Sequence, residues 1–119
     1  MARHNETGKL GEKLAAVYFT EKGYRILHQN WQHNKLEVDI IAEKDGILHF
    51  IEVKTKRTNN YGYPEDQVSK QKIRNLIEAA EEYLHIDSKE WKKIRFDILA
   101  ITILADEKVE YFLIEDVYL

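Results

Sequence analysis

Two short segments of the chain alternate apolar and charged residues, and this pattern constrains the fold more than any other feature. The first segment is 36–41 and the second is 51–54. A period of two is typical of a β-strand with one buried face. Asp45 and Gly46 lie between the segments and form a favoured two-residue turn, so we expect a β-hairpin.

Three charged side chains fall within these apolar strands. Glu52 and Lys54 are two residues apart and share a face, and the hairpin would bring Asp39 alongside them. Carboxylate oxygens bind Mg²⁺ or Mn²⁺, and a lysine beside such an ion can position a water for attack on a phosphate. A structural alternative stays open, in which Asp39 pairs with a lysine and Glu52 with Lys54. A buried ion pair, however, adds little net stability compared with apolar side chains.

Composition favours a folded protein with one domain, which we expect to span residues 1–119. Hydrophobic residues make up 44% of the chain, which is enough for an ordered core. The absence of cysteine excludes disulfides, a thiol nucleophile and a cysteine zinc site. The polar N-terminus and the lack of a long apolar run predict a cytoplasmic protein without a membrane partner.

Charge is distributed unevenly along the chain. The net charge is −3, whereas a nucleic-acid-binding domain is typically basic. Residues 54–74 nevertheless contain six basic and two acidic side chains, while residues 106–116 contain five acidic side chains and one lysine. The basic segment begins at the predicted site, which favours a ligand that carries phosphate.

The remaining periodicities predict an α/β fold, a mixed central sheet of about five strands flanked by helices in the order α-β-β-β-α-β-β. Helices are expected over 5–22, between Asn5 as N-cap and Gly23, and over about 65–86, with Pro64 at its start. Strands are expected at 24–31, 36–42, 47–55, 94–104 and 109–117, the last two joined by a turn at Asp106-Glu107.

An ordered set of residues from Gly8 to about Ile101 resembles the YraN-like family of small bacterial endonuclease-like proteins. The set includes Gly8-Lys9-Leu10-Gly11-Glu12, Glu37-Val38-Asp39-Ile40-Ile41, Phe50-Ile51-Glu52-Val53-Lys54-Thr55-Lys56, Lys72 and Arg95-Phe96-Asp97. The element order also resembles the PD-(D/E)xK nuclease superfamily, the restriction-endonuclease-like fold shared with archaeal Holliday junction resolvases. The family usually has glycine where this chain has Leu36, but the carboxylates are intact.

The resemblance implies a metal-dependent endonuclease that acts on DNA. It implies that Asp39 and Glu52 hold Mg²⁺ or Mn²⁺ and that Lys54 acts on the attacking water. It also implies that Glu12, on the first helix, faces the same site as a further catalytic residue. Gly11 precedes Glu12 and weakens a helix by roughly 1 kcal/mol relative to alanine, so we expect either the sheet or a phosphate backbone close to it.

Three basic residues are predicted to contact nucleic acid. Lys56 continues the face of Lys54, Arg57 lies on the opposite face, and Lys72 lies on the second helix. A solvated surface is the alternative for Arg57 and Lys72. Arg95 and Asp97 are expected to form a structural salt bridge. The five histidines show no ligand spacing, and no role is predicted for them.

The predicted function is therefore hydrolysis of phosphodiester bonds in branched or otherwise structured DNA, in repair or recombination. A catalytically silent nucleic-acid-binding or assembly module on the same fold is the first alternative. The second alternative is a small interaction protein whose ion pairs are structural. The resemblance to junction resolvases also suggests a homodimer.

Overall fold

The computed structural model describes residues 6–58 and 69–117 of the chain. Within these residues the elements follow the predicted order α-β-β-β-α-β-β. They are α1 (Glu6–Glu21), β1 (Arg25–His33), β2 (Leu36–Lys44), β3 (Ile47–Thr58), α2 (Lys70–Ile86), β4 (Ile94–Leu104) and β5 (Val109–Ile114). The predicted α/β fold with a mixed sheet of five strands is confirmed.

The strands form one sheet in the order β1-β2-β3-β4-β5. The first three strands are antiparallel neighbours, and the turn between β2 and β3 lies at Asp45 and Gly46, as predicted. Both turn residues have positive φ angles, 54° and 81°, as a type I′ turn requires, and Gly46 adopts this conformation without strain. β3 and β4 are parallel, and the chain between them, which includes α2, makes the crossover that a parallel pair needs.

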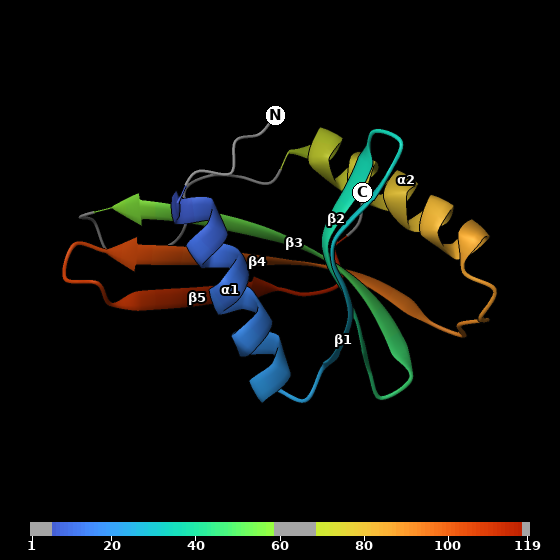
Figure 1. The fold of residues 1–119 in the computed structure, drawn as a ribbon, viewed down its shortest axis with the longest axis horizontal. Coiled ribbons are helices and arrows are strands. Elements are labelled where there is room, and N and C mark those ends of the chain that lie inside the picture. The colour runs from blue at the N-terminus through green and yellow to red at the C-terminus, as the bar shows by residue number, and fades with distance from the viewer. Residues whose placement is uncertain (1–5, 59–68, 118–119) are drawn as a thin grey trace.

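The two helices cover opposite faces of the sheet (Figure 1). On one face, Ala15 and Phe19 of α1 are fully buried in a core cluster with Ile51 of β3. On the other face, Leu76 of α2 is buried in a second cluster with Phe50. Because Phe50 and Ile51 are adjacent on β3, their side chains point to opposite faces, and each helix packs on its own core.

The strand β2 twists sharply near its centre. Val38 and Ile40 are two residues apart, so regular alternation would put both on one face. Instead Val38 packs in the α2 cluster and Ile40 packs in the α1 cluster. The paired register of β2 and β3 also ends at Ile40, opposite Ile51. β2 therefore leaves β3 at Asp39, and from there to Leu36 it stays paired with β1 alone (Figure 1); we call this point the β2–β3 fork.

The second helix begins later than predicted, at Lys70 rather than near residue 65. Ser69 has an extended backbone, and its hydroxyl oxygen accepts a hydrogen bond from the backbone N–H of Lys72. This is the arrangement of a serine N-cap, which fixes the start of the helix. Residues 65–68 lie outside the described residues.

The other helix and strand boundaries lie closer to the predicted positions. β3 continues to Thr58, beyond the predicted end at 55, because it pairs with β4 along this length. β5 ends at Ile114 rather than at 117. Gly23 follows the end of α1 with a φ angle of 92°, as its predicted role requires. The predicted cap Asn5 and the predicted helix entry at Pro64 lie outside the described residues.

The helices are too short and too polar to cross a bilayer. α1 has 16 residues and α2 has 17, and both carry charged side chains along their length. A membrane-spanning helix needs about 20 predominantly apolar residues. Within the part of the chain that the structure describes, no helix meets that requirement.

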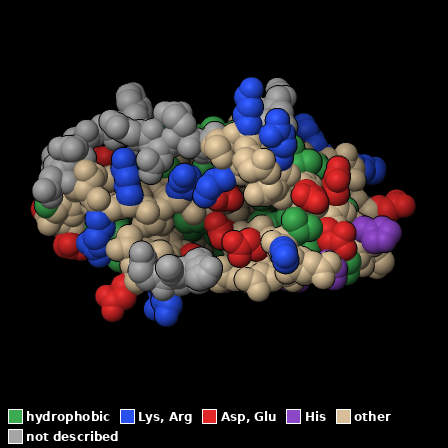
Figure 2. Space-filling view, turned by 90° about the horizontal axis from the view of Figure 1, so that it is seen from above, with side chains coloured by type: hydrophobic (Ala, Val, Ile, Leu, Met, Phe, Trp, Pro, Cys, Tyr) green, Lys and Arg blue, Asp and Glu red, His purple; other side chains and the backbone are tan. Residues whose placement is uncertain are grey.

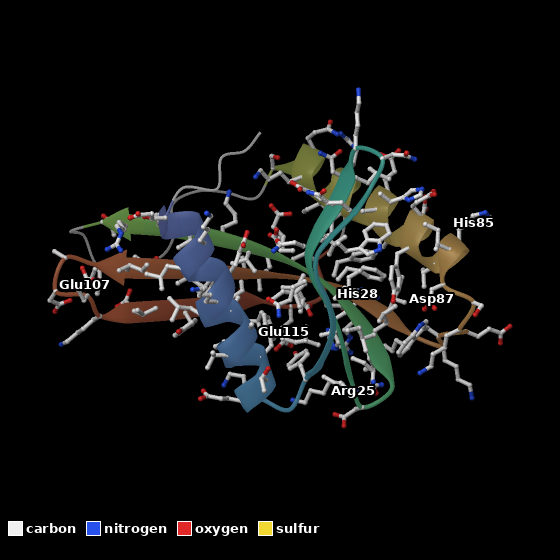
Figure 3. The ribbon with its side chains drawn as sticks, viewed as in Figure 1. Arg25, His28, His85, Asp87, Glu107 and Glu115 are labelled. Atoms are coloured by element: carbon white, nitrogen blue, oxygen red, sulfur yellow. The ribbon has the colours of Figure 1, made fainter. Side chains whose placement is uncertain are left out.

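Charged side chains of both signs lie close together on one face. In Figure 2, acidic side chains gather near the centre of the molecule, and lysine and arginine side chains lie next to them. Other charged groups lie at the ends of the molecule: Figure 3 shows Glu107 at the tip of the β4–β5 hairpin and Asp87, after α2, toward the opposite end.

Candidate functional site

Asp39 lies at the β2–β3 fork, where its carboxylate replaces a backbone hydrogen-bond partner. The N–H of Val53 donates a hydrogen bond to Asp39 Oδ2 at 2.7 Å. Because the pairing of β2 with β3 ends at Ile40, this N–H group would otherwise lack a strand partner on that side. The bond fixes the carboxylate of Asp39 beside the part of β3 that carries Glu52.

Burial and neighbouring negative charges raise the pKa of Asp39 from 3.8 to about 7. Burial has the largest effect, and the hydrogen bond from Val53 opposes it. The negative charges of Glu52, Glu12 and Glu37 raise the pKa further. No ion pair between Asp39 and a lysine or arginine occurs among the described residues, so the structural alternative for Asp39 is not realised there.

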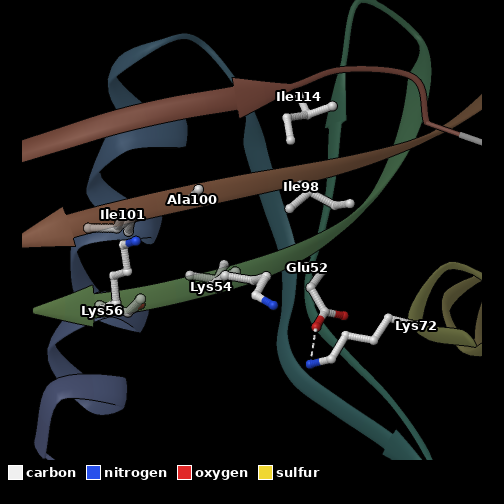
Figure 4. Close-up of a pocket in the computed structure, with 10 residues that line it drawn as sticks. Glu52, Lys54, Lys56, Lys72, Ile98, Ala100, Ile101 and Ile114 are labelled. Carbon is white, nitrogen blue, oxygen red and sulfur yellow. Dashed lines mark ion pairs between the residues drawn. The ribbon is translucent and has the colours of Figure 1, made fainter. Parts of the chain in front are cut away.

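Glu52 pairs with Lys72 of α2 rather than with Lys54 on its own strand. Lys72 Nζ lies 3.6 Å from Glu52 Oε2 (Figure 4). The two side chains are 50% and 25% exposed, and a pair of this kind contributes at most about 1 kcal/mol, so it can open without unfolding the protein. The amine of Lys54 also points toward Glu52 in Figure 4, but the described residues include no ion-pair partner for it.

Glu12 reaches this region because α1 lies very close to β3. A Cβ atom on Gly11 would lie 1.8 Å from Thr55 Oγ1 and 2.7 Å from Thr55 Cβ, so only glycine permits this approach. Of the two explanations for a glycine at this helical position, packing against the sheet is the one that the structure supports. Glu12 follows directly, and its charge acts on Asp39 across the fork.

The carboxylates at the fork fit a metal ion that keeps several waters. Mg²⁺ usually binds through one or two carboxylates and retains water in its other positions, and Asp39 and Glu52 can supply those two. A closed cage is absent: in the described ranges, no group of three His, Cys, Asp or Glu side chains is close enough to hold an ion. Glu12 is therefore not placed as a third ligand beside Asp39 and Glu52.

A pocket of about 140 Å³ begins at Glu52 and extends along β3 and β4 (Figure 4). Its lining residues come from β3, α2, β4 and β5. Lys54, Lys56 and Lys72 are among them, so two of the three predicted nucleic-acid contacts lie beside the predicted catalytic lysine. The structure thus brings Asp39, Glu52 and these lysines into one region.

Arg57 is not part of this group. Its Nε donates to Thr7 Oγ1 at 3.2 Å, and its Nη1 lies 3.3 Å from Glu107 Oε2 at the hairpin tip. Alternation along β3 places Arg57 on the face opposite Lys54 and Lys56. The alternative of a position on the solvated surface fits Arg57, whose side chain is 47% exposed, better than a phosphate contact in the pocket.

Comparison with models of protein families places the chain in one family. Residues 11–101 match the model of "Uncharacterised protein family UPF0102". The chain belongs to this family. The match includes Glu12 and extends through the two strands at the fork into β4, so it covers the carboxylates and lysines of the candidate site. The predicted YraN-like family is confirmed at this level, and the link to the nuclease superfamily stays a prediction.

Several bacterial UPF0102 proteins are similar to this chain over most of their length. One from Flavobacterium johnsoniae is 45% identical over 104 residues, which covers 85% of each chain. One from Phocaeicola vulgatus is 46% identical over 101 residues, covering 85% of this chain and 83% of its own. One from Rhodococcus opacus is 43% identical over 103 residues and 87% of each chain.

This UPF0102 chain also contains a buried pair that the sequence did not reveal. His49 Nδ1 lies 2.6 Å from Asp97 Oδ2, and both residues are almost fully buried. The other oxygen of Asp97 accepts the N–H of Asp116 at 2.8 Å. The predicted salt bridge between Arg95 and Asp97 is therefore wrong, and Arg95 Nε is buried without a partner among the described residues. A histidine inside the apolar run of residues 47–51 was the available signal.

Proposed function

We propose that the chain is a metal-dependent endonuclease that hydrolyses phosphodiester bonds in DNA. The observation that carries the proposal is the partly buried carboxylate of Asp39. It lies near the charges of Glu52 and Glu12, has a pKa of about 7, and forms no ion pair with a described residue. Titratable groups perturbed in this way cluster at functional sites, and a divalent cation is the natural partner of adjacent carboxylates.

Each residue at the fork has a chemical role in this proposal. Asp39 and Glu52 would hold Mg²⁺ or Mn²⁺, and the bound ion would supply Lewis acidity and a water of lowered pKa. Lys54 orients the attacking water and offsets the negative charge that develops on the phosphate. Glu12, outside the immediate ligand set, orients a water on the α1 side. Lys72 can leave Glu52 for a substrate phosphate because its ion pair is weak.

The proposed substrate is branched or otherwise structured DNA, processed in repair or recombination. Lys56 and Lys72 would contact phosphates on either side of Lys54, since all three lysines line one pocket. With a net charge of −3 and so few basic contacts, affinity should be modest and should fall steeply with salt. A homodimer would enlarge the surface that contacts DNA, and we include it in the proposal.

The direct test is incubation of the purified protein with duplex, flapped, single-stranded and four-way DNA in Mn²⁺. The proposal expects cleavage of at least one structured DNA that depends on the metal and is lost in the Lys54→Ala variant. Lys35→Ala is a matched control, because Lys35 is exposed in the turn between β1 and β2 and lies outside the site. Equal cleavage by wild type and Lys54→Ala would indicate a contaminating nuclease and refute the assignment.

A catalytically silent nucleic-acid-binding or assembly module is the second candidate. It is favoured by the Glu52–Lys72 ion pair, which neutralises one of the two proposed metal ligands. It is also favoured by the lack, among the described residues, of a third carboxylate close enough to complete a cage. Such a module would bind DNA with a steep salt dependence, but it would show no cleavage and no rise in Tm with Mn²⁺.

A further inference from the structure

The pocket beside Glu52 is large enough for a ring-shaped group. Its volume of about 140 Å³ is several times the roughly 10–15 Å³ that one water requires. Part of its wall is apolar and comes from neighbouring strands, with Ile98 and Ala100 on β4 and Ile114 on β5 (Figure 4). A metal ion with its waters would not need this apolar extension, because its ligands are oxygen atoms.

The polar part of the same pocket is cationic. Lys54 and Lys56 are two residues apart on β3, which separates their backbones by about 6.6 Å and points both side chains to one face. Lys72 approaches from α2. Apart from Glu52, the side chains that line the pocket carry either no charge or a positive charge. An apolar wall next to several ammonium groups matches a flat, weakly polar ring that is linked to phosphates, which is the chemistry of a nucleotide.

We propose that this pocket receives one unpaired nucleotide next to the phosphate at the β2–β3 fork. The inference rests on the proposed function and adds its substrate class: DNA in which a base is already free of its partner. A paired base would first have to leave the stack, which requires a few kcal/mol and is easiest for a base without a partner. An uninterrupted duplex should therefore bind through its phosphates alone.

The test is fluorescence anisotropy with labelled duplexes in EDTA, so that no cleavage contributes. One duplex carries a single unpaired thymidine, a second carries an abasic nucleotide at the same place, and a third is uninterrupted. The wild type should bind the first about tenfold more tightly than the second, a ratio that corresponds to 1.4 kcal/mol. The second and third duplexes should bind alike.

Variants in β5 test whether this ratio of affinities for the first and second duplexes depends on the pocket. Ile114→Trp should fill the pocket and bring the ratio close to one, while binding of the uninterrupted duplex stays unchanged. Phe112→Trp is the matched control, because Phe112 lies two residues earlier on the same face of β5, is 43% exposed and is outside the lining set. It should keep the full ratio.

A smaller substitution keeps the test decisive if Ile114→Trp does not fold. Ala100→Val adds two methyl groups to the pocket wall at a strand position where a β-branched residue is favourable, and it should reduce the ratio. A wild-type ratio near one, or a ratio unchanged in every folded pocket variant, overturns the inference. If the ratio depends on the pocket but no DNA is cleaved, the pocket inference stands and the proposed hydrolysis fails.

Discussion

Replacing Asp39 with asparagine should stabilise the metal-free protein, and the gain should increase with pH. Burial, together with the charges of Glu52 and Glu12, raises the pKa of Asp39 from 3.8 to about 7 in the folded state. A carboxyl group whose pKa is higher in the folded state than in the unfolded state binds its proton more tightly there. Its ionisation therefore destabilises the fold progressively as pH rises from about 4 to about 7.

The magnitude follows from the size of the shift. A shift of about three units corresponds to about 4 kcal/mol, and this destabilisation is fully present above about pH 7 and absent below about pH 4. Asparagine does not ionise, and its amide oxygen can still accept the N–H of Val53. Between about pH 4.5 and about pH 8, the stability of Asp39→Asn relative to wild type should therefore rise by about 3 kcal/mol.

Urea unfolding of both proteins at the two pH values measures this change, and the comparison cancels the titration of the other groups. Glu43→Gln is a control of opposite sign. The hydrogen bond from Arg25 lowers the pKa of Glu43, so this carboxylate stabilises the fold at high pH and loses its effect as pH falls. Glu43→Gln should thus be less stable than wild type at about pH 8, and this deficit should shrink rather than grow as pH falls toward the lowered pKa of Glu43. A pH-independent difference between Asp39→Asn and wild type would refute the reasoning.

Three further predictions concern packing, the buried pair and binding. Gly11→Ala should destabilise the protein by about 3 kcal/mol, because its methyl group would overlap Thr55, and a second change, Thr55→Gly, should recover much of the loss in urea unfolding. His49→Phe should lower the free energy of unfolding by about 3 kcal/mol, because it leaves one oxygen of the buried Asp97 without its partner, and thermal unfolding by circular dichroism measures this. Replacing Lys56 and Lys72 together by alanine should flatten the slope of log K against log [salt] by up to about two units in anisotropy titrations; an unchanged slope would place the DNA contacts elsewhere.

The strands and the β2–β3 hairpin could be predicted because their signals are local. Alternation of apolar and polar residues identifies a half-buried strand without knowledge of its neighbours, and Asp45-Gly46 specifies a two-residue turn by its own backbone preferences. Once that turn is fixed, the register between β2 and β3 is fixed too. The proximity of Asp39 to Glu52 follows from this register, so the centre of the candidate site was accessible from the sequence.

The partners of the charged groups could not be predicted from the sequence in the same way. Lys72 meets Glu52 only because α2 begins at Lys70 and packs where its first turn faces β3, and no local pattern specifies that docking position. His49 and Asp97 meet because β3 and β4 are parallel and their register places the two side chains on one face. Such contacts depend on how elements dock, and periodicity within one element carries no information about docking.

The fold requires a hydrogen-bond acceptor at position 39, but it does not require a charge there. The N–H of Val53 must be satisfied where β2 leaves β3, and an amide oxygen would serve as well as a carboxylate. The carboxylate instead lies partly buried near Glu52 and Glu12, where its ionisation weakens the fold. A charged side chain is characteristic of a functional site when a neutral side chain of the same shape would fit its position and would make the fold more stable. A bound divalent cation would relieve the repulsion between these carboxylates, so the part of the penalty that comes from repulsion would favour metal binding.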